Sequence, residues 1–185
     1  MTLSAPQLAR QLADVLEAAA IPHAIGGALA LGVWGFPRAT NDVDVDAFVE
    51  ADAIDGLLQA LKNAGFEIDE PASRRSALER GDFKFYVSRM RVDVFIASIP
   101  FYDEVRRRIR RAVLEGRPAW FLAPEDLIVF KLLFFRSKDR LDVERLVEFL
   151  GDQLDRGLVG SALADLLGPS DERVAWWKEH ASDVS

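Results

Sequence analysis

Apolar and polar positions alternate along the first third of the chain with two different periods, one typical of helices and one typical of strands. Helical spacing runs from Ser4 to Ala20, where leucines recur every three to four positions and Ser4 can cap the first turn. The period of two runs from Asp42 to Val49, where valines alternate with aspartates. Between them, a short apolar strand enters a Gly-Gly turn, and a short apolar helix is ended by Gly35 and Pro37. The predicted elements are a helix over Ser4–Ala20, a strand over Ile21–Ile25, a helix over Ala28–Trp34, a strand over Asp42–Val49 and a helix over Ala53–Ala64.

The middle of the chain favours strands and its end favours helices. Strands are predicted over Phe66–Ile68, Phe83–Val87 and Arg91–Ala97, with a polar connection over Ser73–Arg80 and a short turn that makes the last two strands an antiparallel hairpin. Pro100 is predicted to close the sheet, before a helix over Tyr102–Leu114 and a short strand around Trp120. The remaining helices are predicted over Pro124–Phe135, over Asp139–Leu150, around Leu163 and over Asp171–His180. The sequence therefore predicts an α/β (α+β) fold, with a mixed-sheet core over residues 1–123 and a helical region over residues 124–185 packed on it.

Composition narrows the kinds of site that the chain can hold. The 185 residues include no cysteine and two histidines, which excludes thiolate zinc sites and disulfides and disfavours a histidine-rich metal site. Oxygen atoms would then hold any metal, as they hold magnesium, manganese and calcium. The formal charge of −7 disfavours general coating of nucleic acid but leaves room for a local basic face. No apolar run approaches the ~20 residues that span a bilayer and the N-terminus shows no signal pattern, so the chain is expected to be cytoplasmic and to bind no membrane.

Three aspartates at alternate positions, Asp42, Asp44 and Asp46, are the most informative feature of the sequence. On a strand, all three side chains share one face. Like charges side by side destabilise a strand, which favours a divalent cation as the counter-charge. The structural alternative is an edge strand that uses charge to block aggregation. A calcium EF-hand is excluded, because Ala47 and Ala53 stand where its loop requires Gly and Glu.

Asp93 is the fourth carboxylate of interest, because it interrupts the apolar strand Val92–Ile96. An ionised group in such a strand needs a partner. That partner could be Arg91 or Lys84 in a structural ion pair. If the strand instead lies beside the Asp42 strand, three carboxylates converge, and such a set can hold two magnesium ions ~3.5–4 Å apart for phosphoryl chemistry.

The Gly-Gly turn, the short helix, the Arg-x-Thr-x-Asp-hydrophobic-Asp strand and the later lone Asp together resemble the nucleotidyltransferase superfamily typified by DNA polymerase β. The residues that carry this resemblance are Gly26, Gly27, Arg38, Thr40, Asp42, Asp44 and Asp93. The segment from Pro124 to Asp142 is similar to a minimal bacterial branch that includes abortive-infection-type nucleotidyltransferase toxins. The resemblance covers most of the chain up to about Leu150.

The resemblance implies a reaction in which an acceptor hydroxyl attacks the α-phosphate of a nucleoside triphosphate and pyrophosphate leaves. Asp42, Asp44 and Asp93 would be the catalytic and metal-binding residues for two Mg²⁺ ions, with Mn²⁺ as a substitute. The expected nucleotide-binding residues are Gly26, Gly27, Ala28, Arg38, Thr40, Lys131 and Arg136. Ala28 departs from the many members of the superfamily that have Ser after the glycine turn. Asp44 and Asp46 form a second Asp-x-Asp register, and the first is preferred because Arg38-x-Thr40-x-Asp42 completes the longer pattern.

Structural explanations compete with several of these roles. Lys131 is surrounded by core-like residues, so its alternative role is to extend along the helix to the surface. Asp139 and Asp142 are explained equally well as residues that cap and charge a helix N-terminus. The arginine run over residues 106–111 fits the solvated face of a helix, and His23 fits a structural position before the glycine turn.

The sequence therefore predicts a metal-dependent nucleotidyltransferase that transfers a nucleoside monophosphate to an unknown hydroxyl on RNA, protein or a small molecule. Transfer RNA is one candidate acceptor, with the arginine run as the first place to look for its binding surface. The toxin branch would add a cognate antitoxin protein as a partner. The alternative is a catalytically inactive nucleotide-binding or regulatory module of the same fold, for which Ala28 is the one internal hint.

Overall fold

The computed structural model describes residues 3–181, and its secondary structure follows the order predicted for most of the chain. The elements of residues 3–122 are α1 (Ala5–Ala18), β1 (His23–Ile25), α2 (Gly27–Trp34), β2 (Asp42–Ala47), η1 (Ala51–Ala53), α3 (Ile54–Asn63), α4 (Glu70–Arg80), β3 (Asp82–Val87), β4 (Met90–Ile96), α5 (Phe101–Arg108), β5 (Arg110–Leu114) and β6 (Arg117–Phe121). The helices that follow are α6 (Pro124–Phe134), α7 (Ser137–Leu150), η2 (Gly151–Gln153), α8 (Arg156–Leu167) and α9 (Glu172–Ala181).

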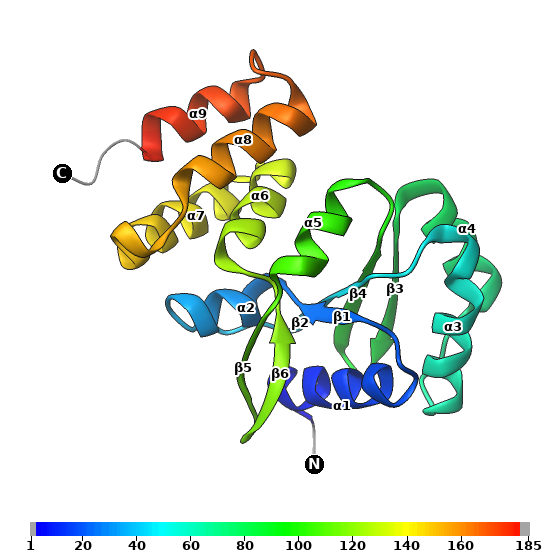
Figure 1. Cartoon of the computed structure of the whole chain (residues 1–185). Helices are drawn as coiled ribbons and strands as arrows, with labels where there is room; N and C mark the ends of the chain where they lie inside the picture. Colours follow the sequence, from blue (N-terminus) through cyan, green and yellow to red (C-terminus); the bar gives the residue numbers. More distant parts are fainter. Residues whose placement is uncertain (1–2, 182–185) are drawn as a thin grey trace. The chain divides into compact units, whose positions relative to one another are not determined.

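The strands of the described residues form one mixed sheet in the order β3-β4-β2-β1-β6-β5 (Figure 1). The pairs β2–β4 and β1–β6 are parallel, whereas β1–β2, β3–β4 and β5–β6 are antiparallel. The mixed sheet with surrounding helices confirms the predicted α/β fold class. The antiparallel pairing of β3 with β4 also confirms the predicted hairpin.

The valines that alternate with the aspartates of β2 form part of the core. Val43 and Val45 are fully or almost fully buried. Helix α1 packs against β1, β2 and β6, and α3 packs against α1. The first turn of α1 is fixed by a capping box, in which the backbone N–H of Gln7 donates to the Ser4 hydroxyl and the backbone N–H of Ser4 donates to the Gln7 side chain. The cap predicted at Ser4 is therefore confirmed.

Helix α4 corrects two predictions, the strand over Phe66–Ile68 and the polar connection over Ser73–Arg80. Residues 66–69 form no strand, and Glu70–Arg80 is helical. Its apolar pattern is weak, because Ser73 and Ala77 are the residues of α4 that are buried. Local polar contacts replace that pattern: the Asp69 side chain caps the helix by accepting from the backbone N–H of Ala72.

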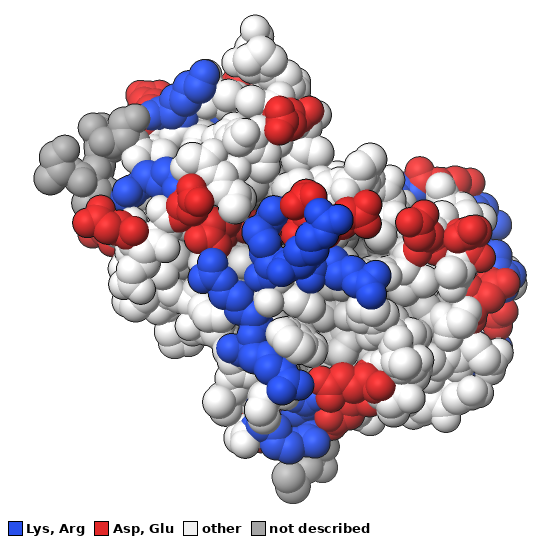
Figure 2. Space-filling view, in the orientation of Figure 1, with Lys and Arg blue, Asp and Glu red and all other residues white. Residues whose placement is uncertain are grey.

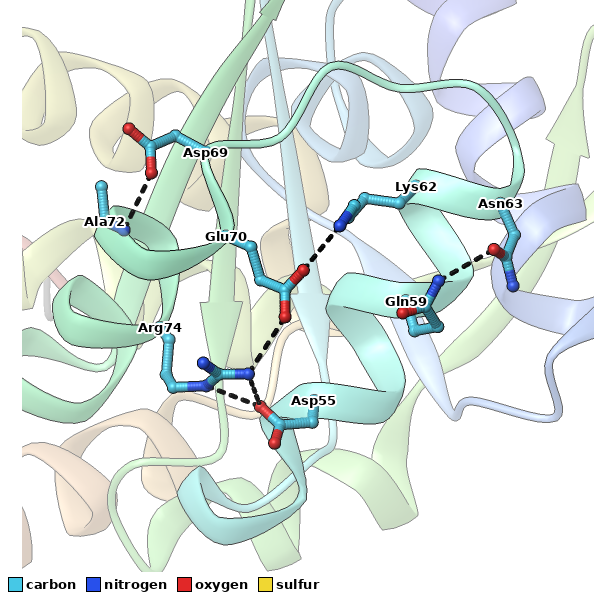
Figure 3. Close-up of polar contacts among 8 residues, drawn as sticks. All are labelled: Asp55, Gln59, Lys62, Asn63, Asp69, Glu70, Ala72 and Arg74. Carbon is cyan, nitrogen blue, oxygen red and sulfur yellow. Dashed lines mark hydrogen bonds and ion pairs between the residues drawn. The ribbon is translucent and has the colours of Figure 1, made fainter.

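Ion pairs join α4 to α3 (Figure 3). Lys62 of α3 lies 2.7 Å from a carboxylate oxygen of Glu70, and Arg74 of α4 lies 2.6 Å from Asp55 and 3.1 Å from Glu70. The hydrogen bond from Lys62 is the main cause that lowers the pKa of Glu70. A polar segment that reads as a loop in the sequence is therefore a helix with a side-chain cap and exposed ion pairs to α3.

The predicted helix over Tyr102–Leu114 is too long, and Pro100 does not close the sheet. Helix α5 ends at Arg108, and Ile109 has extended backbone angles (φ −53°, ψ 143°). Residues Arg110–Leu114 then form β5, which pairs with β6 as an edge hairpin of the sheet. The arginine run therefore divides between a helix and a strand. Its second part is a strand because it pairs with β6, and the spacing of residues in the sequence does not reveal this pairing.

The chain divides into two compact units. One consists of Met1–Leu29 and Arg38–Leu122, and the other of Ala30–Pro37 and Ala123–Ser185, so residues 30–37 belong with the C-terminal helices. In the second unit, α6 packs against α7 and α8, and α8 packs against α9. Between residues 3 and 181, no helix has both the length and the apolar character needed to cross a membrane.

Candidate active site

The aspartates of β2 and Asp93 of β4 lie side by side in the first unit. Strands β2 and β4 are parallel, with Asp44 level with Asp93 and Asp42 level with Arg91. Neighbouring strands are ~4.8 Å apart, and level residues of a parallel pair point to the same face. The condition for convergence of the three carboxylates, that the Asp93 strand lies beside the Asp42 strand, is therefore met.

Arg91 joins two of these carboxylates. Its Nε donates to Oδ2 of Asp93 at 2.7 Å, and its Nη2 donates to Oδ2 of Asp42 at 3.3 Å. Partial burial opposes the charge of the guanidinium, but the hydrogen bond to Asp93 and the charges of Asp93, Asp42 and Asp44 outweigh it and raise the pKa of Arg91. The ion pair that the sequence offered as a structural explanation for Asp93 is thus present, and it includes Asp42.

Asp46 has a different environment from the other two aspartates of β2. The residue is 4% exposed, and its Oδ1 accepts a hydrogen bond from the Tyr102 hydroxyl at 3.2 Å. The side chain of Asp42 is 39% exposed. Burial, with the nearby charge of Asp46, strongly raises the pKa of Tyr102, so its hydroxyl keeps the proton that it donates. These contacts favour Asp42 and Asp44 over Asp44 and Asp46 as the pair open to a ligand.

The Gly-Gly turn lies against the same aspartates. The backbone N–H of Gly26 donates to the carbonyl of Asp44 at 3.0 Å, and a Cβ at Gly26 would lie 2.9 Å from Oδ2 of Asp46. A Cβ at Gly27 would overlap the carboxylate of Asp44, and Gly27 has a φ of +54°. Glycine is therefore required at position 27 by space and by backbone conformation. Helix α2 begins at Gly27, and Ala28 is buried.

Thr40 fixes the start of β2. Its hydroxyl oxygen accepts from the backbone N–H of Asp42 at 3.1 Å and lies 3.1 Å from the carbonyl oxygen of the same residue. This geometry orients Asp42 at the first position of the strand and gives Thr40 a structural role. Arg38, two residues earlier, is exposed.

Lys131 and Arg136 lie in the second unit, and each has an acidic partner there. Nζ of Lys131 lies 2.8 Å from Oδ2 of Asp142, with their side chains 8% and 6% exposed. The idea that Lys131 extends to the surface is therefore wrong. Arg136 pairs with Asp139 at 2.6 Å, and Asp139 also accepts from the backbone N–H of Arg136. Asp139 caps α7 as the structural explanation predicted, whereas Asp142 serves as the counter-charge of a buried lysine.

Two residues that sequence reasoning did not place in the site are Tyr102 and Arg91. Tyr102 carries no local signal, because it reaches Asp46 from α5, 56 positions away in the sequence. Arg91 was identified only as an ion-pair partner. Its spacing of two residues from Asp93 is the signal for a shared face of β4.

The donor set fits a hard divalent cation in its chemistry. Asp42, Asp44 and Asp93 supply carboxylate oxygens from adjacent strands, which Mg²⁺ and Mn²⁺ prefer. In the part of the chain that the structure describes, however, no group of three or more acidic, histidine or cysteine side chains is arranged as a metal site. Two of the three carboxylates are instead oriented toward the guanidinium of Arg91.

Comparison with known proteins rests on structure. No protein-family model and no curated protein sequence matches the chain. The solution structure of the antibiotic-resistance factor ANT(2'')-Ia matches with a TM-score of 0.61 at 16% sequence identity, over 97% of this chain and 97% of that chain. The chain has a nucleotidyltransferase fold.

A second structure of the same protein also matches. The crystal structure of ANT(2'')-Ia in complex with adenylyl-2''-tobramycin matches with a TM-score of 0.59 at 16% identity, over 87% of this chain and 97% of that chain. At this identity the likeness establishes the fold and does not carry substrates from one protein to the other.

Proposed function

We propose that the chain is a metal-dependent nucleotidyltransferase that transfers a nucleoside monophosphate from a nucleoside triphosphate to an acceptor hydroxyl. The observation that carries this proposal is the position of Asp44, which is level with Asp93 on the neighbouring strand and lies against the Gly26-Gly27 turn. Carboxylates and a glycine turn at a helix start are the two parts that phosphoryl transfer needs, one for cations and one for the triphosphate.

Each part has a defined task in the reaction. The backbone N–H groups at the start of α2 would bind the triphosphate, since Gly27 leaves no side chain in their way. The acceptor oxygen would form a bond to the α-phosphorus, the bond to pyrophosphate would break, and Asp93 would help to take the acceptor's proton. Asp42, Asp44 and Asp93 would hold Mg²⁺ or Mn²⁺, which supplies charge stabilisation at the attacking and leaving oxygens.

The proposal is tested by incubating the protein with α-labelled triphosphates, Mg²⁺ and a cell extract, and comparing it with Asp44→Asn. Because several kcal/mol of charge stabilisation depend on this carboxylate, label transfer is expected to fall about 100-fold or more. Asp55→Asn is the matched control: it makes the same change at a carboxylate on α3 that pairs with Arg74. Equal transfer by the wild type and Asp44→Asn would contradict the proposal.

A catalytically inactive nucleotide-binding module of the same fold is the second candidate. The observation that favours it is Ala28, whose methyl group is buried where many superfamily members present a serine hydroxyl to phosphate. Calorimetry distinguishes the two candidates: the inactive module binds triphosphate and Mg²⁺ but leaves the nucleotide uncleaved in every extract.

For the acceptor, we propose a polyanion such as transfer RNA. Residues 106–117 contain six arginines and one acidic residue, Glu115, in a chain whose net charge is −7. Basic atoms gather over the region where Figure 1 places α5 and β5 (Figure 2). Arg111 also stacks on Trp120 at 4.7 Å, which places a planar cation and an aromatic ring together as nucleic-acid surfaces do. A toxin role with an antitoxin partner stays a prediction of the sequence resemblance.

A further inference from the structure

Arg91 lies at the centre of the carboxylates on which the proposed function depends. It is the residue whose guanidinium contacts both Asp93, at 2.7 Å, and Asp42, at 3.3 Å. Asp44 is level with Asp93 in the sheet. The guanidinium of Arg91, a monovalent cation, therefore contacts the carboxylates that the proposed reaction needs for divalent cations.

The sheet places Arg91 there. Arg91 and Asp93 are two positions apart on β4 and so share a face, and Arg91 is level with Asp42 across the parallel pair. Its backbone N–H donates to the carbonyl of Asn41 at 3.3 Å, which anchors its backbone to the segment just before β2. The side chain can therefore reach carboxylates of both strands from a fixed base.

The side chain of Arg91 has room to turn away from these carboxylates toward solvent. Its side chain is 39% exposed, whereas the Lys131 side chain in its ion pair is 8% exposed. The Asp42 side chain is likewise 39% exposed, so solvent can replace that ion pair, whereas the Asp93 side chain is 14% exposed and needs the incoming divalent cation as its new counter-charge. A guanidinium stays protonated across the ordinary pH range, so it leaves by rotation of the side chain and not by losing a proton.

We propose that Arg91 is an internal counter-cation that holds Asp42 and Asp93 in the metal-free protein and competes with the divalent cation for them. This inference rests on the proposed function and adds a step to it, because Arg91 has to turn away before the carboxylates can bind metal. The competition is electrostatic: a guanidinium and a divalent cation within a few ångströms repel each other strongly. Arg91 thus sets the metal affinity of the site without being a ligand.

The test is a calorimetric titration of the nucleotide-free protein with Mn²⁺. Arg91→Gln is expected to bind Mn²⁺ about 10-fold more tightly than the wild type, because repulsion by one charge a few ångströms away is removed. It is also expected to have a lower Tm in EDTA and to gain more Tm from Mn²⁺, since the carboxylates lose their counter-charge. Arg89→Gln is the matched control: it makes the same charge change at an exposed turn position two residues earlier, and its Kd should stay at the wild-type value.

A measurement on the wild type covers the case in which Arg91→Gln does not fold. Mg²⁺ is expected to shift the NMR signal of the Arg91 Nε–H, because its hydrogen bond to Asp93 is broken. An unchanged signal at saturating Mg²⁺ overturns the inference. If Arg91→Gln and Arg89→Gln bind Mn²⁺ with equal Kd values, the inference fails and the proposed function stands. If the wild type and both variants bind no Mn²⁺, the inference and the proposed function both fail.

Discussion

At the scale of single residues, burial determines the protonation state of the histidine that precedes the glycine turn. His23 precedes the turn on β1 and is 2% exposed. Its Nδ1 lies 3.0 Å from the carbonyl oxygen of Ile21, and its Nε2 has no hydrogen-bond partner within residues 3–181. Burial lowers the pKa of His23 below its ordinary value of 6.5, against the hydrogen bond to Ile21, which raises it. The histidine that the sequence predicted as structural is therefore buried in its neutral form.

A pH dependence follows from this lowered pKa. In the unfolded chain His23 takes up a proton near pH 6.5, whereas in the folded chain it does so at lower pH. Its contribution to stability is therefore complete above about pH 6.5 and is lost as the pH falls through the folded pKa. His23→Asn does not titrate and keeps a donor toward Ile21. Urea unfolding between pH 5 and pH 8 should show that the wild type loses more stability than His23→Asn below about pH 6.5. Parallel curves for the two proteins would contradict the assignment.

At the scale of elements, the sequence predicted most of the helices and strands of the described residues and missed α4 and β5. Helices α1 and α3 and strands β2 to β4 were predicted, because each has an apolar face or an alternation of its own. Helices α6 to α9 were also predicted, although α6 is buried on nearly all sides and has no single apolar face. Helix α4 was missed because its apolar pattern is weak, and β5 was missed because Val105, Ile109 and Val113 recur with helical spacing through it. The apolar residue Phe66, predicted to start a strand, packs on Phe85 at 5.5 Å from a loop.

The cap of α4 can be tested directly. Asp69→Ala removes the acceptor for the backbone N–H of Ala72 and should lower the free energy of unfolding by about 0.5–2 kcal/mol. Asp69→Asn keeps a cap acceptor without the charge and should restore most of that loss. Denaturation with urea, followed by circular dichroism, measures both. Equal stability of Asp69→Ala and the wild type would show that the ion pairs between α3 and α4 suffice without the cap.

At the scale of the whole molecule, charge is unevenly distributed along an acidic chain. The sequence has 30 acidic and 23 basic residues, and six of the basic residues are the arginines of residues 106–117. Several of these side chains have acidic partners, as Arg107 has in Glu104 and Arg117 has in Asp14. The segment nevertheless carries the excess positive charge that the rest of the chain lacks, which is the physical basis for proposing a polyanionic acceptor.

This proposal predicts how RNA binding depends on salt. Replacing Arg106, Arg110 and Arg111, which are all exposed, with glutamine should weaken binding of fluorescent transfer RNA. The slope of log K against log salt should become less steep by about 0.7–0.9 for each arginine that contacts a phosphate. The matched control replaces Arg75, Arg80 and Arg89, which are exposed arginines elsewhere in the first unit. Fluorescence anisotropy at several salt concentrations gives both slopes, and equal slopes for the two triple variants would exclude this surface.

The sequence by itself determined the fold class and the candidate carboxylates. Alternation put Asp42, Asp44 and Asp46 on one face, and this follows from strand geometry whatever the strand pairs with. Which residues lie level across two strands depends on register, which nonlocal packing sets. Only the tertiary structure could therefore place Asp44 beside Asp93, bury Asp46 under Tyr102 and bring Arg91 to Asp42.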